Sequence, residues 1–205
     1  MSILTELFYL PTLEFFTAVL GHEEICVDGG ENYQKQSYRN RTSILLANKV
    51  EVLSVPVLGG NKGLPYREVK IDYGQKWKNV HLRGIQSGYG KAPFFEYFYP
   101  YFEKVYQKNL AFLFDLNLEL LTVCLNLLQL DVKLSVMGNI GQKTSENDIR
   151  GLINAKKGFE SRSFYQSHTY SQLFGVNFAP NLSVIDLLFC EGPASKNILW
   201  TSQKK

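Results

Sequence analysis

The first 28 residues constrain the fold most, because they have the order strand, helix, strand. Residues 6–10 have an extended, apolar pattern, and residues 24–28 are rich in β-favouring side chains. Between them, residues 12–20 form a short helical segment with proline before its first residue and glycine after its last, as helix termini prefer. Two strands joined by a crossover helix run parallel. The sequence therefore predicts an α/β fold that opens with a strand-helix-strand unit.

The next segments predict antiparallel strands in addition to this parallel pair. Residues 42–46 and 50–57 are separated by a short turn, as in a β-hairpin. Residues 67–72 alternate polar and apolar side chains, which is typical of a half-buried strand. We therefore expect a mixed β-sheet.

Several helices towards the C-terminus are predicted to cover the sheet. From Trp77 to Tyr89 every fourth residue is aromatic, histidine or isoleucine, so these side chains share one helical face. Further helices are predicted at 94–106, 109–130 and 183–191. The helix at 109–130 is apolar nearly all round, as in a helix buried among others.

The last of these helices has an apparent cap at its start. Ser183 and Asp186 stand at the spacing of a capping box, in which the serine hydroxyl satisfies a free backbone N–H of the first turn. We therefore interpret these two residues as structural rather than catalytic.

Residues 1–205 are expected to form a single domain, since chains of this length bury one core. Within it, residues 131–163 are polar, glycine-rich and charged. This composition predicts a long loop that could act as a lid or be partly disordered.

Composition excludes several classes of partner and cofactor. The 22 basic and 19 acidic residues leave a net charge of only +3, so nucleic-acid binding is not expected. The apolar run from 110 to 130 carries two acidic residues and two asparagines, which a lone membrane span would rarely hold. The N-terminus has no signal-peptide pattern, so we expect a cytoplasmic protein.

The cysteines predict no metal site. Cys26, Cys124 and Cys190 lie far apart, without the spacing of zinc or redox motifs, and are interpreted as reduced structural thiols. The sequence identifies no cofactor and leaves the oligomeric state open.

Several phrases, in order along nearly the whole chain, resemble the WbqC-like family of bacterial proteins associated with surface-polysaccharide biosynthesis. One departure lies at the opening, where Glu6-Leu7 stand in place of the family's Gln-Pro pair. The phrases are Tyr9-Leu10-Pro11 with Phe16; Val27-Asp28; Tyr33-Gln34-Lys35 through Tyr38-Arg39-Asn40-Arg41; Val55-Pro56-Val57; Trp77 to His81 with Tyr89, Ala92, Pro93 and Phe94; Leu116-Asn117-Leu118; and Asn181 to Phe189 with Glu191-Gly192.

The resemblance implies a role in assembling sugar polymers such as O-antigen or lipopolysaccharide. It suggests a transferase that places an acyl or aminoacyl group on an activated sugar. The alternative, from another class, is a non-catalytic protein of the same pathway that binds a sugar nucleotide or scaffolds other enzymes. An enzyme should show a concave site with a positioned base, whereas a scaffold should show an exposed apolar patch.

A basic and aromatic cluster after the second strand is the predicted ligand site. Arginine clamps phosphate or carboxylate and tyrosine offers a stacking face, so we expect an anionic small molecule such as a nucleotide, sugar nucleotide or acyl donor. If an arginine of this cluster is exposed and contacts phosphate, its replacement should weaken binding with little loss of stability. The other interpretation is a solvated edge strand. The predicted ligand-binding residues are Lys35, Tyr38, Arg39, Asn40 and Arg41, with Tyr9 from the opening phrase.

Two residues are predicted as catalytic. His81 could act as a general base because imidazole titrates near neutrality, although a packed histidine is the alternative on this helical face. Asp28 ends a strand, where side chains point into the crevice of α/β sheets, although a turn-forming aspartate fits equally.

Overall fold

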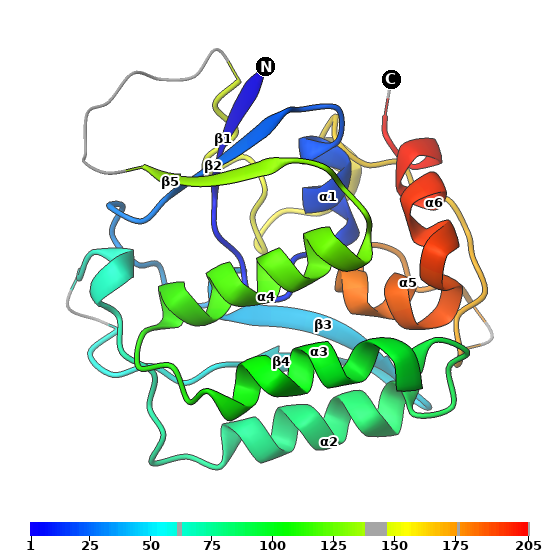
Figure 1. Cartoon of the computed structure of the whole chain (residues 1–205), viewed down its shortest axis with the longest axis horizontal. Helices are drawn as coiled ribbons and strands as arrows, with labels where there is room; N and C mark the ends of the chain where they lie inside the picture. The colour runs from blue at the N-terminus through cyan, green and yellow to red at the C-terminus, as the bar shows by residue number, and fades with distance from the viewer. Residues whose placement is uncertain (61–62, 138–146, 176, 205) are drawn as a thin grey trace.

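The computed structural model describes residues 1–60, 63–137, 147–175 and 177–204, and its helices and strands are shown in Figure 1. In chain order they are β1 (Ser2–Glu6), α1 (Leu13–Val19), β2 (Glu24–Asp28), β3 (Arg41–Leu46), β4 (Lys49–Ser54), α2 (Trp77–Tyr89), α3 (Phe95–Gln107), α4 (Leu113–Leu127), β5 (Lys133–Met137), α5 (Val184–Glu191) and α6 (Ser195–Thr201), with 3-10 turns at Tyr66–Glu68, Phe159–Ser161 and Gly192–Ala194.

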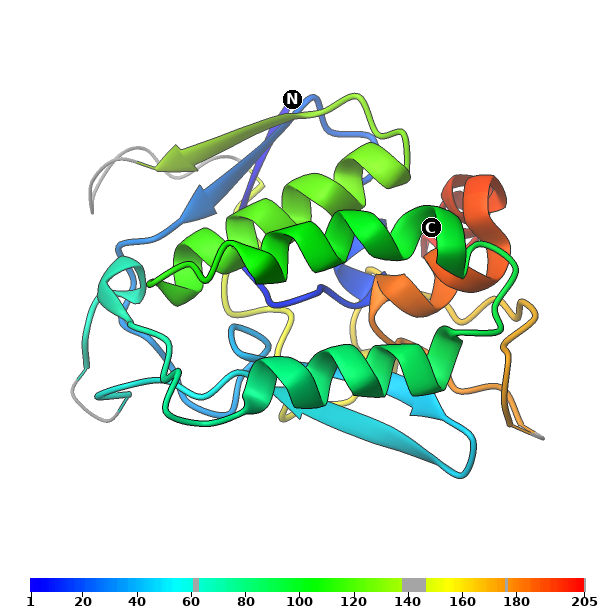
Figure 2. The same cartoon turned by 60° about the horizontal axis from the view of Figure 1, so that its bottom comes forward.

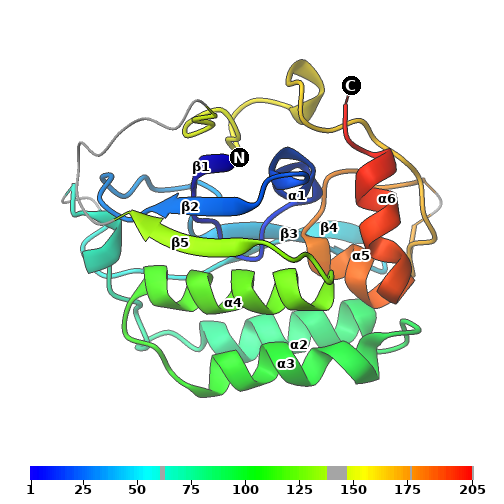
Figure 3. The same ribbon diagram turned by 45° about the horizontal axis from the view of Figure 1, so that its top comes forward.

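A parallel sheet with the strand order β1-β2-β5 organises one side of the molecule. β2 is its central strand, and the last residue of β1, Glu6, pairs in register with the last residue of β2, Asp28. β5 continues the same direction beside β2, so the arrowheads of β2 and β5 point to the same side in Figure 3. The carboxyl ends of the strands therefore meet at one edge of the sheet.

The antiparallel strands form a second, separate sheet. β3 and β4 pair over their whole lengths in a hairpin, which runs along α2 in Figure 2. The predicted α/β class is confirmed, including the strand-helix-strand opening and the C-terminal helices. The parallel and antiparallel strands lie in two sheets.

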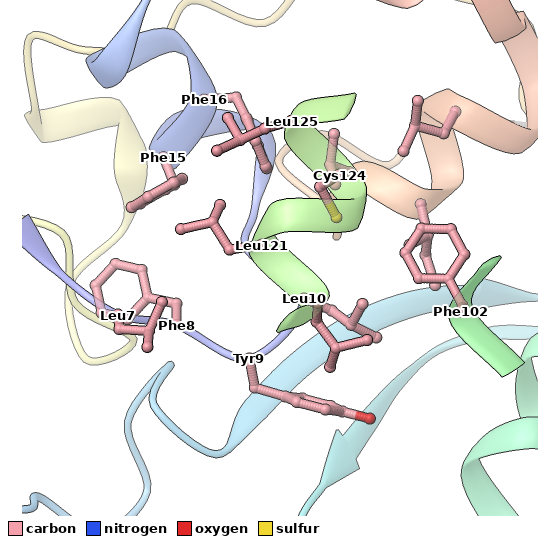
Figure 4. Packing of buried hydrophobic residues seen from close by; sticks show 14 of the residues in the cluster. Leu7, Phe8, Tyr9, Leu10, Phe15, Phe16, Phe102, Leu121, Cys124 and Leu125 are labelled. Atoms are coloured by element: carbon pink, nitrogen blue, oxygen red, sulfur yellow. The ribbon is translucent and has the colours of Figure 1, made fainter. Parts of the chain in front are cut away.

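The buried helix α4 lies at the centre of the core. In Figures 1 and 3 it is the helix next to β5, with α3 and α2 farther from the parallel sheet. Figure 4 shows Leu121 and Leu125 of α4 facing Phe15 and Phe16 of α1. α4 packs against α3, α5 and the Tyr66 turn, and most of its leucines are buried there, whereas Asp115, Thr122 and Asn126 lie on one exposed face. No helix in the described ranges is long and apolar enough to cross a membrane.

Two predicted strands are wrong. The first strand covers residues 2–6, not 6–10, because the apolar run at 7–10 is core-filling coil in which Leu10 adopts a φ of 41°. Residues 67–72 contain part of a 3-10 turn and two isolated bridges instead of a strand. In both segments, the apolar side chains are buried by tertiary packing without a continuous strand partner, and periodicity alone cannot distinguish these cases.

The predicted loop at 131–163 contains a strand, and the fold has a further helix beyond 191. β5 occupies 133–137, and in the rest of that segment residues 138–146 lie outside the described residues. Residues 147–163 have no strand or α-helix, but Ile149 and Ile153 anchor them in the core. α6 follows the Gly192-Pro193 pair and lies beyond the last helix that the sequence predicted, at 183–191.

Ser183 does not cap α5 with its side chain, contrary to the expected capping box. Its hydroxyl donates to the Leu10 carbonyl at 3.0 Å, and the Thr42 hydroxyl donates to the same oxygen at 2.8 Å. Ser183 is fully buried. The two hydroxyls thus join the start of α5 and β3 to the strained turn at Leu10.

A capping serine and a serine that donates to the Leu10 carbonyl predict different stabilities for variants at position 183. Ser183→Ala should lower the free energy of unfolding by about 1 kcal/mol, as expected for one buried hydrogen bond. Ser183→Asp should be worse, by about 3 kcal/mol, because a buried carboxylate would face the Leu10 carbonyl. Urea unfolding of both variants tests this. An aspartate variant as stable as wild type would restore the capping interpretation, since aspartate is a good N-cap.

Candidate functional site

A buried arginine joins the carboxylates at the edge of the parallel sheet. The Arg39 side chain is only 2% exposed, and its Nη2 donates to Glu6 Oε1 at 2.8 Å and to Glu31 Oε2 at 2.5 Å. Its Nη1 donates to the Asn32 carbonyl at 2.5 Å, and the guanidinium lies over the Tyr66 ring. Arg39 therefore fixes the end of β1 against the loop that follows β2.

A second arginine connects the same edge to the segment after β5. Arg150 Nη1 donates to Asp28 Oδ2 at 2.5 Å, and its Nε and Nη2 donate to the carboxylate of Asp148. The backbone N–H of Gly151 donates to Glu6 Oε2 at 2.8 Å. Strand ends and the 148–151 segment are thus held together by charged side chains.

The electrostatic environment differs among these carboxyl groups. Burial raises the pKa of Glu31, the Arg39 guanidinium acts against this, and the carboxylates of Glu6 and Asp28 raise it further. The hydrogen bonds from Arg150 lower the pKa of Asp148. The pKa of Glu31 is therefore displaced towards neutrality, and that of Asp148 away from it.

Three adjoining cavities form a groove between residues 31–43 and residues 148–157. We name them the carboxylate, lysine and arginine cavities, with volumes of about 480, 300 and 340 Å³. The carboxylate cavity is lined by Glu6, Glu31, Asn32, Gln34, Asp148, Arg150 and Gly151. The lysine cavity shares Glu6, Gln34 and Gly151 with it and adds Phe8, Lys35, Gln36, Ser37, Tyr38, Ile153, Asn154, Ala155, Lys156 and Lys157. The arginine cavity shares Gln36, Tyr38, Ala155 and Lys156 with the lysine cavity and adds Arg41, Thr42, Ser43 and Val52.

The four cations of the lysine and arginine cavities have no carboxylate partners within the part of the chain that the structure describes. None of the ion pairs found there includes Lys35, Arg41, Lys156 or Lys157. Arg41 also has a buried Nε without a hydrogen-bond partner. Half of the groove is therefore basic and available to an anion, next to a half lined by carboxylates.

The predicted ligand residues divide between the groove and the interior. Lys35, Tyr38 and Arg41 line the groove. Arg39 does not fit the expectation of an exposed arginine, because it is buried in the ion pairs beneath the groove. Asn40 is also buried, and its Nδ2 donates to the Val55 carbonyl at 2.9 Å, which ties the start of β3 to the end of the hairpin.

The structure does not bring Tyr9 and His81 to the groove. Both are buried, and the Tyr9 hydroxyl lies 2.7 Å from His81 Nδ1 while it is hydrogen-bonded to the Tyr106 hydroxyl. Trp77 packs edge-on against the His81 ring. This environment matches the alternative of a packed histidine, and the catalytic role of His81 stays a prediction.

Asp28 lies at the predicted place, the end of a strand, but in a different cluster from His81. Its Oδ1 accepts a hydrogen bond from the Gly30 N–H at 2.8 Å, as in a turn, while its Oδ2 binds Arg150. Both carboxylate oxygens are engaged. Its catalytic role also stays a prediction.

Sequence reasoning missed Glu6, Glu31, Arg150, Lys156 and Lys157. Glu6 carried a signal, because it stands at a departure from the family's opening phrase. The two lysines follow β5 by about twenty residues and reach the groove only through tertiary structure. Among the described residues, no group of three or more histidine, cysteine, aspartate or glutamate side chains could hold a metal ion.

Comparison with known proteins supports the resemblance. The model of the WbqC-like protein family matches residues 8–166 and 154–198, which include both walls of the groove. The chain is similar to the uncharacterized protein Rv1507c of Mycobacterium tuberculosis, with 24% identity over 221 residues that cover 93% of this chain and 94% of that protein. No solved structure matches the chain.

Buried His81 should make stability depend on pH. Burial lowers the pKa of its imidazole from 6.5 to about 4, against a backbone hydrogen bond to Ser54 that raises it. As the pH is lowered, the imidazole is protonated near pH 6.5 in the unfolded chain but only near pH 4 in the folded protein. The free energy of unfolding therefore falls as the pH decreases from about 6.5 to about 4. The loss should be on the order of 3 kcal/mol.

Urea unfolding of wild type and His81→Asn at pH 7 and pH 4.5 isolates this contribution. The variant lacks the titrating ring but keeps a polar side chain, so wild type should lose more stability than the variant between the two pH values. Equal losses in the two proteins would show that His81 is not held neutral by burial.

Proposed function

The chain belongs to the WbqC-like protein family, and from this premise we propose that it acts in the assembly of bacterial surface glycans such as O-antigen. In this proposal the groove binds an anionic, phosphate-bearing small molecule, either a sugar nucleotide or an activated acyl donor. The observation that carries the proposal is the set of four cations without carboxylate partners on facing walls of the groove, within the described residues.

The arrangement of charge along the groove supports a phosphorylated sugar. Guanidinium and ammonium groups bind phosphate oxygens through charge-assisted hydrogen bonds. At the other end, Glu31 and Asp148 present carboxylate oxygens that accept hydrogen bonds from hydroxyl or amino groups. A molecule with an anionic part and a hydroxyl-rich part therefore matches both halves of the groove.

The reaction proposed is transfer of an acyl or aminoacyl group to such a sugar. An amino or hydroxyl group of the sugar attacks the carbonyl carbon of an acyl thioester, the new C–N or C–O bond forms, and the C–S bond breaks as the thiolate leaves. Glu31 takes the proton from the attacking group in this scheme, because it borders the carboxylate cavity and its pKa is raised by burial. Neither Asp28 nor His81 lines the groove, whereas Glu31 does, which favours Glu31 as the base.

A second candidate function is binding of the same class of ligand without turnover. The ion pair between Glu31 and Arg39 favours this alternative, because a paired carboxylate is a weaker base. Release of free thiol from an acyl thioester, dependent on an added amino sugar and lost in Glu31→Gln, would support catalysis. Ligand binding without thiol release would support the alternative.

Arg41 offers the direct test of ligand binding. A thermal-shift screen against nucleotides, sugar nucleotides and acyl-CoA donors should identify a stabilising ligand, since a molecule that binds the native state raises its apparent stability. Arg41→Ala should then weaken the affinity for that ligand by about tenfold or more, as expected for a lost charge-assisted contact. Arg41→Lys should give a partial loss if the contact is bidentate.

Arg83 provides the matched control, because it is exposed on α2 and does not line the groove. Arg83→Ala removes the same charge and should leave the affinity unchanged. Calorimetric titration of the three variants measures the ranking. Wild-type affinity in Arg41→Ala would mean that the ligand binds elsewhere.

A further inference from the structure

The lysine and arginine cavities are neighbours that share residues of both walls of the groove, including one cation. Lys156 lines both cavities, as do Gln36, Tyr38 and Ala155. Each cavity also has cations that the other lacks. Lys35 and Lys157 line only the lysine cavity, and Arg41 lines only the arginine cavity. The basic half of the groove is therefore two adjacent sites joined at Lys156.

This duplication matters because one phosphate needs only one such site. With about 300 and 340 Å³, each cavity has room for a phosphate group and part of its substituent. A single phosphate in either cavity would leave the cation of the other cavity without a counter-charge. Two phosphates joined by a bridging oxygen would engage both sets of cations at once.

We propose that the groove is specific for a diphosphate linkage, with one phosphate in the lysine cavity, the other in the arginine cavity, and Lys156 bound between them. This inference rests on the proposed function and deepens it, because it narrows the ligand to a diphosphate ester, the class to which sugar nucleotides belong. Lys156 is a specificity residue in this arrangement, since it contacts both phosphates and distinguishes a diphosphate from a monophosphate.

The walls at this point are held in a way that suits a fixed spacing of two phosphates. Tyr38 packs edge-on against Phe8 with ring centroids 5.7 Å apart, so its ring is fixed where the two cavities meet. On the opposite wall, buried Ile153 anchors the segment that leads to Lys156. Arg41 is fixed at its backbone, as the first residue of β3, in register with Ser54 of β4.

Two ligands of equal charge distinguish a pair of phosphate sites from non-specific attraction to a basic surface. At pH 8, uridine monophosphate and UDP-glucose both carry a charge of about −2, given a second phosphate pKa near 6. A basic surface without two sites would bind them about equally. Calorimetric titration of wild type should instead give UDP-glucose an affinity about tenfold or more above that of the monophosphate, because one additional charge-assisted contact has about this effect.

Lys156→Ala tests which residue creates this preference. The variant should lose about tenfold or more in affinity for UDP-glucose and markedly less for uridine monophosphate, so the ratio between the two should fall towards one. Lys91→Ala is the control, since Lys91 is exposed, lines none of the three cavities and carries the same charge. It should keep the wild-type ratio.

The outcomes distinguish the two proposals. Equal affinities for both probes in wild type, or an unchanged ratio in Lys156→Ala, would overturn the diphosphate site while leaving the anion-binding groove in place. Binding of neither these probes nor any anion of the thermal-shift panel would overturn the proposed function and the diphosphate site with it.

Discussion

The ion pairs of Arg39 are the interaction on which the rest of the site depends. A guanidinium that is 98% removed from solvent must be paired, and here it is bound by the last residue of β1 and by Glu31 of the loop after β2. Such a buried pair adds little net stability compared with an apolar core, but removal of one partner leaves an unpaired charge in the interior. Arg39 therefore determines where Glu6 and Glu31 lie. Glu6 in turn accepts a hydrogen bond from the backbone N–H of Gly151 on the facing wall. Through these contacts one buried side chain positions both walls of the groove.

The parallel sheet explains why the site forms at this edge. Strands that run in one direction bring their carboxyl ends together, and ligands of open α/β sheets commonly bind beyond those ends. Here β1 and β2 end with carboxylates, while the loop after β2, the start of β3 and the segment 148–157 supply the cations of the basic half of the groove. The apolar helix α4 fills the core beside the sheet, so the charged groups lie at the periphery of the sheet. The family match covers both walls but begins at residue 8, after Glu6.

Sequence patterns predicted the elements whose residues are local and periodic. β2 at 24–28 and α2 at 77–89 have the predicted bounds, because a single buried stripe defines each of them. β5 was hidden in a polar segment, since its pairing with β2 joins residues more than one hundred positions apart. The same limit applies to the site. Lys35, Tyr38 and Arg41 were accessible to sequence reasoning because they follow one another, whereas Arg150 and Lys156 join them only in the folded chain. For Arg39 the sequence could not distinguish a ligand contact from an internal ion pair, because both use the same residue type at the same spacing. Its burial in the folded chain shows that it forms an internal ion pair.

The coupling free energy between Arg39 and Glu6 tests the central claim most directly. It is obtained by urea unfolding of wild type, Arg39→Ala, Glu6→Gln and the double variant, with glutamine chosen to keep the shape and hydrogen-bonding capacity of Glu6. If Arg39 holds the carboxyl edge, the single Arg39→Ala change should cost about 3 to 5 kcal/mol, and the double variant should be at least about 1 kcal/mol more stable than the sum of the single changes predicts. Additive effects within about 0.5 kcal/mol would show that Arg39 and Glu6 act independently, and the account of how the groove is positioned would be wrong.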